Sequence, residues 1–141
     1  MATPPVMRIA DLELFADCTK AELRQIGSLT TYLQVRKDHV LMREGGRANE
    51  FVVIGSGSAQ VSRNTTHGVI RVADVGSGDF LGEMGLLSGT SRTATVTATT
   101  DLAVLVSSAI EFRSILHISP SVADKVVHTS TVRAAGMGIA A

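Results

Sequence analysis

The sequence predicts a mainly β fold with flanking helices: one short helix, then a series of strands, then two helices. Two observations support this. From Thr30 to Val106, short β-branched runs alternate with glycine, as in antiparallel sandwiches and barrels. A Ser/Thr-x-x-Glu pattern, which caps the first turn of helices, occurs before this region at 19–22 and after it at 108–111. Strands that alternate with long helices, as in parallel β-α-β folds, are not predicted.

The first helix is expected to begin after Thr19, with Leu23 and Ile26 on its apolar side. A hairpin loop is expected at 64–68, where Asn, Thr, His and Gly separate two apolar runs. The predicted strands cover residues 31–35, 51–54, 59–62, 69–75, 93–99 and 102–106.

Two helices are expected after the last strand. The first covers 109–117 and follows a capping box formed by Ser108 and Glu111. The second covers 120–135 and opens with Pro120, since a proline in the first helical position has no amide to leave unpaired. It is rich in β-branched residues and ends before Gly136, so its helix propensity is weak.

Length and composition fit one globular domain covering residues 1–141, with residues 1–7 expected to be disordered. The formal net charge is zero and no basic block occurs, which disfavours nucleic-acid binding and a polybasic membrane anchor. The single cysteine, Cys18, excludes an intrachain disulfide and fits a reducing compartment. The sequence contains no signal-peptide pattern or membrane-length apolar run, so we expect a cytoplasmic protein without membrane insertion.

One segment of the strand region contains the candidate ligand-binding residues. In GDFLGEMGLLSGTSRTATV, which starts at Gly78, Glu83 and Arg92 are the only charged residues after Asp79. Glycine-rich backbone that enters a short helix exposes amide groups that bind anions, and an arginine can clamp phosphate oxygens. A carboxylate would repel phosphate but accepts hydrogen bonds from a sugar hydroxyl. This combination, with one positive charge, predicts a compact nucleotide with one phosphate.

This segment resembles the phosphate-binding cassette of cyclic nucleotide-binding domains, the family found in the catabolite activator protein and the regulatory subunit of cAMP-dependent protein kinase. The family pattern is approximately F-G-E-(L/I)-A-L-(L/M), a short gap, then P-R-(A/S/T)-A-(T/S)-V. Here it is LGEMGLL from Leu81 and RTATV from Arg92. The departures are Leu81 for phenylalanine, Gly85 for alanine and Ser91 for proline, of which the last two suggest a more flexible cassette.

The resemblance implies roles for individual residues. Glu83 would accept from the ribose 2′-hydroxyl, and Arg92 would pair with the cyclic phosphate. Backbone amides of the cassette and the Thr93 hydroxyl would complete the site. The full predicted ligand-binding set is Leu81, Gly82, Glu83, Met84, Gly85, Leu86, Arg92, Thr93 and Ala94.

The resemblance also implies a β jelly-roll barrel and a regulatory role. The ligand would be cAMP ahead of cGMP, with no catalysis and no cofactor. Ligand capture would move the helix at 109–117 and close the 120–135 helix as a lid, so that an effector domain or protein responds. The effector is not identified, and a homodimer is left open.

Three alternatives remain at this stage. Glu83 and Arg92 could form a structural ion pair, the domain could be a ligand-free interaction module, or it could be a regulatory segment of a larger enzyme or transporter. Metal-dependent catalysis is disfavoured, because the four histidines lack the close spacing of a metal site. They are His39, His67, His117 and His128.

Overall fold

The computed structural model describes residues 8–135. The helical elements are the 3₁₀ turns η1 (Ile9–Asp11) and η2 (Glu13–Phe15) and the helices α1 (Lys20–Ser28), α2 (Glu83–Ser88), α3 (Ala109–Ile118) and α4 (Pro120–Ala135). The strands are β1 (Thr31–Val35), β2 (Val40–Met42), β3 (Glu50–Ser56), β4 (Ser58–Thr65), β5 (Gly68–Gly76), β6 (Phe80–Leu81), β7 (Thr95–Ala98) and β8 (Leu102–Ser108).

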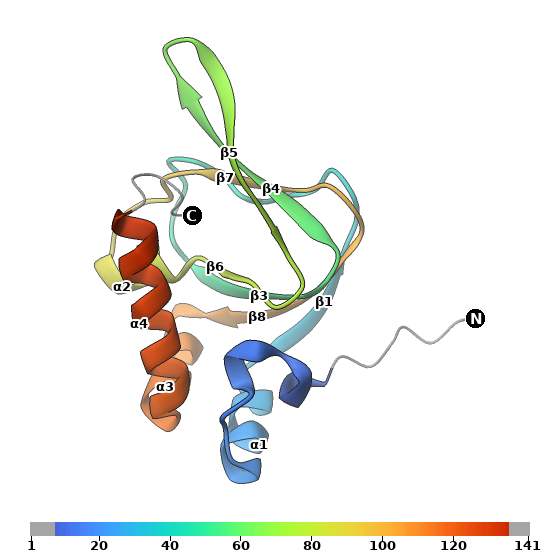
Figure 1. Ribbon diagram of the computed structural model, residues 1–141, viewed down its shortest axis with the longest axis vertical. Coiled ribbons are helices and arrows are strands. Elements are labelled where there is room, and N and C mark those ends of the chain that lie inside the picture. Colours follow the sequence, from blue (N-terminus) through green and yellow to red (C-terminus); the bar gives the residue numbers. More distant parts are fainter. Residues whose placement is uncertain (1–7, 136–141) are drawn as a thin grey trace, which may run out of the picture.

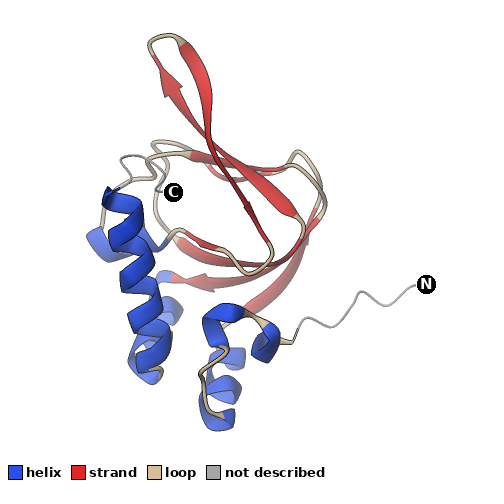
Figure 2. Ribbon diagram, in the orientation of Figure 1, coloured by secondary structure: helices blue, strands red, loops and turns tan. Residues whose placement is uncertain are grey.

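The strands form two four-stranded antiparallel sheets, in the orders β1-β8-β3-β6 and β2-β7-β4-β5. Figure 1 shows the sheets facing each other, with α4 beside one end of the sandwich and the β4–β5 hairpin projecting beyond it. Colouring by secondary structure makes the separation of strands from helices clear (Figure 2). The predicted class, mainly β with flanking helices, is confirmed, and the sandwich is compatible with the jelly-roll description.

Side-chain alternation along the strands of the first sheet separates two apolar cores. In β3, Phe51 and Val53 face the helices, whereas Val52 and Ile54 face the second sheet. The helical core includes Phe15, Phe112, Val122 and Val126. The inter-sheet core includes Leu81, Ala94, Val96 and Val104.

Both predicted capping boxes are present. The Thr19 side chain accepts from the amide of Glu22 at 3.1 Å, and the Glu22 carboxylate accepts from the amide of Thr19 at 3.0 Å. Ser108 and Glu111 make the same reciprocal bonds at 3.1 and 2.9 Å. These bonds satisfy amides that have no partner within the helix, so both helices begin where the sequence predicts.

The strand predictions were wrong at three places, one of which is the two-residue strand β6, which was not predicted. β2 was not predicted, because charged residues flank its three residues. The strand expected at 93–99 begins only at Thr95. Its start is displaced because the backbone of Arg92 bonds to the loop at Gly45 and Gly46, with N–O distances of 2.8 and 2.9 Å, and not to a strand.

The long helix α4 forms despite its weak propensity, because tertiary contacts hold its first half. Val122 and Val126 are fully buried. Lys125 Nζ donates to the Glu13 carbonyl at 2.7 Å and lies 3.1 Å from the Asp17 carboxylate. The predicted disorder of residues 1–7 and the predicted helix end at Gly136 lie outside the described residues. None of the described helices is long and apolar enough to cross a membrane.

Candidate functional site

The cassette begins with a left-handed turn that only glycine adopts without strain. Gly82, with φ of +93°, joins β6 to α2. A Cβ atom at this position would lie 2.5 Å from the Glu50 carbonyl oxygen and 2.9 Å from Arg92 Nη1. Backbone, arginine and the start of α2 therefore approach one another more closely than a side chain at position 82 would allow.

Arg92 is buried and is held by backbone carbonyls. Its Nη1 donates to the Gly82 carbonyl at 2.9 Å and its Nη2 to the Glu50 carbonyl at 2.6 Å. Burial lowers the pKa of Arg92, while Glu50 and Glu83 raise it. An arginine in this setting stays protonated. These two bonds engage two of the five guanidinium N–H groups, so the side chain retains donors for an anion.

Glu83 is completely buried, and only one of its two carboxylate oxygens has a hydrogen-bond partner among the described residues. Its Oε1 accepts from Arg133 Nη1 at 2.6 Å. Its Oε2 is buried and has no hydrogen-bond partner within residues 8–135. Burial raises the pKa of the Glu83 carboxyl, and the Arg133 charge opposes this rise. A buried carboxylate oxygen without a donor is unusual and calls for an explanation.

Arg133, from α4, is the site residue that sequence reasoning missed. Its Nη2 donates to the Phe80 carbonyl at 2.7 Å, and its guanidinium carbon lies 5.2 Å from the centre of the Phe80 ring. The helical period gave a signal, since Val122, Val126 and Arg133 fall on one face of α4. The ion-pair partner of Glu83 is therefore Arg133, not Arg92, and the idea of a site with one positive charge is wrong.

The other predicted site residues lie in three settings. Leu81 and Ala94 are buried in the inter-sheet core, Met84 and Leu86 are half-buried, and Thr93 is exposed. Gly85 packs so closely that a Cβ there would lie 2.7 Å from the Ala48 Cβ. The structure thus brings Gly82, Glu83 and Arg92 together.

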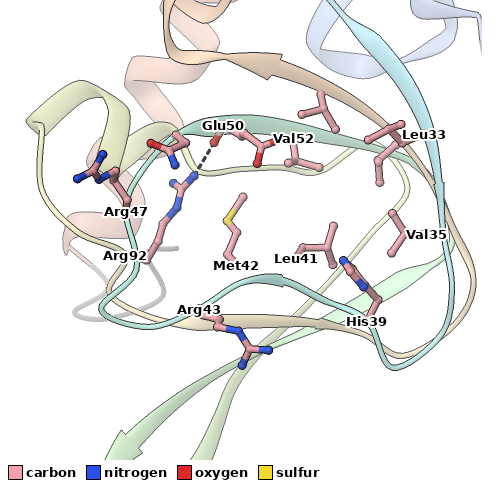
Figure 3. Close-up of a pocket in the computed structure, with 13 residues that line it drawn as sticks. Leu33, Val35, His39, Leu41, Met42, Arg43, Arg47, Glu50, Val52 and Arg92 are labelled. Atoms are coloured by element: carbon pink, nitrogen blue, oxygen red, sulfur yellow. Dashed lines mark hydrogen bonds between the residues drawn. The ribbon is translucent and has the colours of Figure 1, made fainter.

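A cavity of about 210 Å³ lies between the sheets next to Arg92. Figure 3 shows Arg92 at one end, His39 at the other, and aliphatic side chains such as Leu41 between them. Of the pair Glu83 and Arg92, only Arg92 lines this cavity. Within the part of the chain that the structure describes, no cluster of three His, Cys, Asp or Glu residues could hold a metal ion.

Comparison with known proteins decides the family. The model of the cyclic nucleotide-binding domain matches residues 32–119. The chain belongs to the cyclic nucleotide-binding domain family. Such a domain is regulatory and not itself catalytic. The resemblance found in the sequence is therefore confirmed.

Several curated relatives match most of this chain. Acetyltransferase Pat from Mycolicibacterium smegmatis is 34% identical over 127 residues, which are 90% of this chain and 38% of that protein. A cyclic nucleotide-gated potassium channel from Rhizobium etli is 30% identical over 91% of this chain and 35% of its own length. The chain thus spans little more than a third of these curated relatives.

Solved structures agree with this fold. A cAMP-binding acyltransferase from Mycobacterium smegmatis superposes with a TM-score of 0.76 at 33% identity, covering 90% of this chain and 40% of that chain. The catabolite activator protein of Thermus thermophilus superposes with a TM-score of 0.78 at 21% identity, covering 87% of this chain and 58% of that one.

Proposed function

We propose that this domain binds a 3′,5′-cyclic nucleotide, cAMP ahead of cGMP, through Glu83 and Arg92. The observation that carries the proposal is that the buried Glu83 Oε2 has no hydrogen-bond partner among the described residues. This oxygen lies one residue from the Gly82 carbonyl that accepts from Arg92. A ribose 2′-hydroxyl would supply the donor that this oxygen lacks. Arg92 would supply the charged hydrogen bonds that a phosphate needs.

The rest of the cassette would complete phosphate binding. The amides of Gly82, Met84 and Gly85 lie in the tight turn and first helical turn, where backbone N–H groups favour anions. The Thr93 hydroxyl follows Arg92 in sequence and would add a contact. Leu81, Leu86 and Ala94 would shape the surrounding apolar wall.

Similarity to cAMP-responsive proteins supports the choice of base. The solved acyltransferase at 33% identity is described as cAMP-binding. The cAMP-dependent protein kinase regulatory subunit of Mycosarcoma maydis is 30% identical over 64% of this chain. We therefore expect cAMP to bind more tightly than cGMP, with measurable cGMP binding. A competition assay in which cGMP binds about tenfold more tightly, or by about 1.4 kcal/mol, would contradict this.

Calorimetry on the whole chain with cAMP, cGMP and 5′-AMP tests this function. The variant Arg92→Ala should bind cAMP about thirty-fold to several thousand-fold more weakly, a loss of about 2–5 kcal/mol for a buried charge contact. Arg24→Ala, which removes an exposed arginine of α1, is the matched control and should bind normally. If none of the three nucleotides binds wild-type protein, the ligand-free interaction module becomes the better description.

Helix α4 is proposed as the lid that reports ligand binding. Arg133 and the ribose would use different oxygens of the same carboxylate, so the position of α4 and the occupancy of the site are linked. Hydrogen exchange should show greater amide protection in residues 120–135 when cAMP is bound. Identical exchange with and without cAMP would remove α4 from the mechanism.

The output is proposed to be control of an effector and not catalysis by this domain. The similar acetyltransferase and potassium channel suggest that such a domain regulates enzymes and transporters. Capture of a partner on immobilised chain, with and without cAMP, tests this. The amount captured should depend on cAMP for wild type and not for Arg92→Ala, and a partner captured equally under all conditions would contradict it.

A further inference from the structure

Strand β1 is an edge strand that lacks the usual protection against pairing. Exposed strand edges present unpaired backbone groups, and proteins normally guard them with charges, proline, bulges or short length. Residues 31–35 read Thr-Tyr-Leu-Gln-Val, with no charge and no proline. Their register against β8 is continuous over all five residues. Tyr32 is 36% exposed and Leu33 is 45% exposed.

The other three sheet edges are guarded. β6 has two residues and β2 has three, and β2 also carries an irregularity in its register. β5 is longer, but it is bulged opposite Val61 and Ser62 and carries the charged pair Arg71 and Asp74. Of the edges in the described part of the chain, β1 alone combines five regular residues with an uncharged surface.

We propose that β1 pairs antiparallel with β1 of a second copy of this chain, which joins the two first sheets into one eight-stranded sheet. The strand is complementary to itself about Leu33. With Leu33 facing Leu33 of the second copy on a two-fold axis, each Tyr32 lies opposite a Gln34 and each Thr31 opposite a Val35.

The side chains support this register over others. Tyr32 and Gln34 share a face and already lie close within one strand, with Gln34 Nε2 3.5 Å from the Tyr32 hydroxyl. Across the two-fold axis the same groups would form two equivalent amide–hydroxyl pairs. No like charges meet within the strand, so the repulsion that a charged strand would meet on pairing with its own copy is absent.

β1 lies away from the cassette helix α2, and its Leu33 and Val35 line the end of the cavity far from Arg92. Figure 1 shows β1 on the side of the sandwich opposite α4 and α2. The pairing therefore does not depend on the proposed function. A five-residue strand buries less than the roughly 1,200–2,000 Å² of a standard interface, so we expect a weak, concentration-dependent dimer.

Charge reversal at the two-fold axis tests the proposal by analytical ultracentrifugation over micromolar to millimolar concentrations. Leu33→Lys places two lysines opposite each other and Leu33→Glu two glutamates, so each variant alone should dimerise at least tenfold more weakly than wild type. An equimolar mixture should recover a dimer of one copy of each. Circular dichroism and thermal melting would verify that both variants are folded.

Ile110→Lys, at a 74% exposed apolar position on α3, is the matched control and should dimerise like wild type. Wild-type protein that stays monomeric throughout the range would overturn the proposal. So would a Leu33→Lys variant that is folded and still dimeric, because the interface would then lie elsewhere. Failure of the mixture to recover a dimer would show that position 33 does not face itself.

Discussion

Glu83 is the residue on which the proposed site depends. It lies in the first turn of α2, fully removed from solvent, with one oxygen on Arg133 and the other without a described partner. Burial raises its pKa above the ordinary value, so the folded state disfavours the ionised form more than the unfolded chain does. Such an arrangement reduces the stability of the free domain.

A pH dependence of stability follows. Because the pKa of Glu83 is raised on folding, its contribution to stability is complete below the ordinary pKa and is lost as pH rises through the raised value. Glu83→Gln does not titrate. The unfolding free energy of wild type minus that of Glu83→Gln should therefore fall as pH rises, measured by urea unfolding from about pH 4 to 8. A difference that grows with pH would mean that the Arg133 charge outweighs burial.

At the scale of elements, α2 is fitted to the loop before β3. Gly85 stands where the family usually has alanine, and Ala48 supplies a methyl group in that space. The glycine is therefore explained by packing as well as by flexibility.

Gly85→Ala should lower the unfolding free energy by about 1–2 kcal/mol, since the clash with Ala48 outweighs the gain in helix propensity. Adding Ala48→Gly should recover part of this loss. Denaturant unfolding of both single variants and the double variant measures the coupling. Strict additivity would show that the two positions do not contact each other.

Arg133→Gln should loosen the end of α4. It leaves Glu83 without its charged partner, so the last two turns of α4 should lose amide protection while residues around Val122 and Val126 keep theirs. Lys125→Gln is the control, because it disturbs the contact with Asp17 near the first half of the helix. A uniform loss of amide protection along α4 in Arg133→Gln would contradict the prediction that Arg133 holds only the end of the helix.

At the scale of the whole molecule, local signals predicted most of the fold. The caps at Thr19 and Ser108 predicted where α1 and α3 begin, and the glycine-punctuated runs predicted β1, β3, β4, β5 and β8 but not the short strands β2 and β6. Contacts between distant segments could not be predicted in the same way. The start of β7 depends on backbone bonds between Arg92 and the loop at Gly45 and Gly46, and the partner of Glu83 comes from α4, 50 residues later. Only the three-dimensional packing brings these groups together.

Helix α4 behaves as a lever arm: its first half is fixed by buried contacts, and its last turn is held by a single side chain. Val122, Lys125 and Val126 hold the first half of the helix, and Arg133 connects its last turn to Glu83 of the cassette. At about 1.5 Å of rise per residue, the stretch from Val126 to Arg133 spans roughly 10 Å, so a tilt of about 10° moves Arg133 by roughly 2 Å. That displacement is enough to break the 2.6 Å hydrogen bond between Arg133 and Glu83 while Val122 and Val126 stay buried. On the proposed mechanism, a small rearrangement at the cassette would therefore release the end of α4.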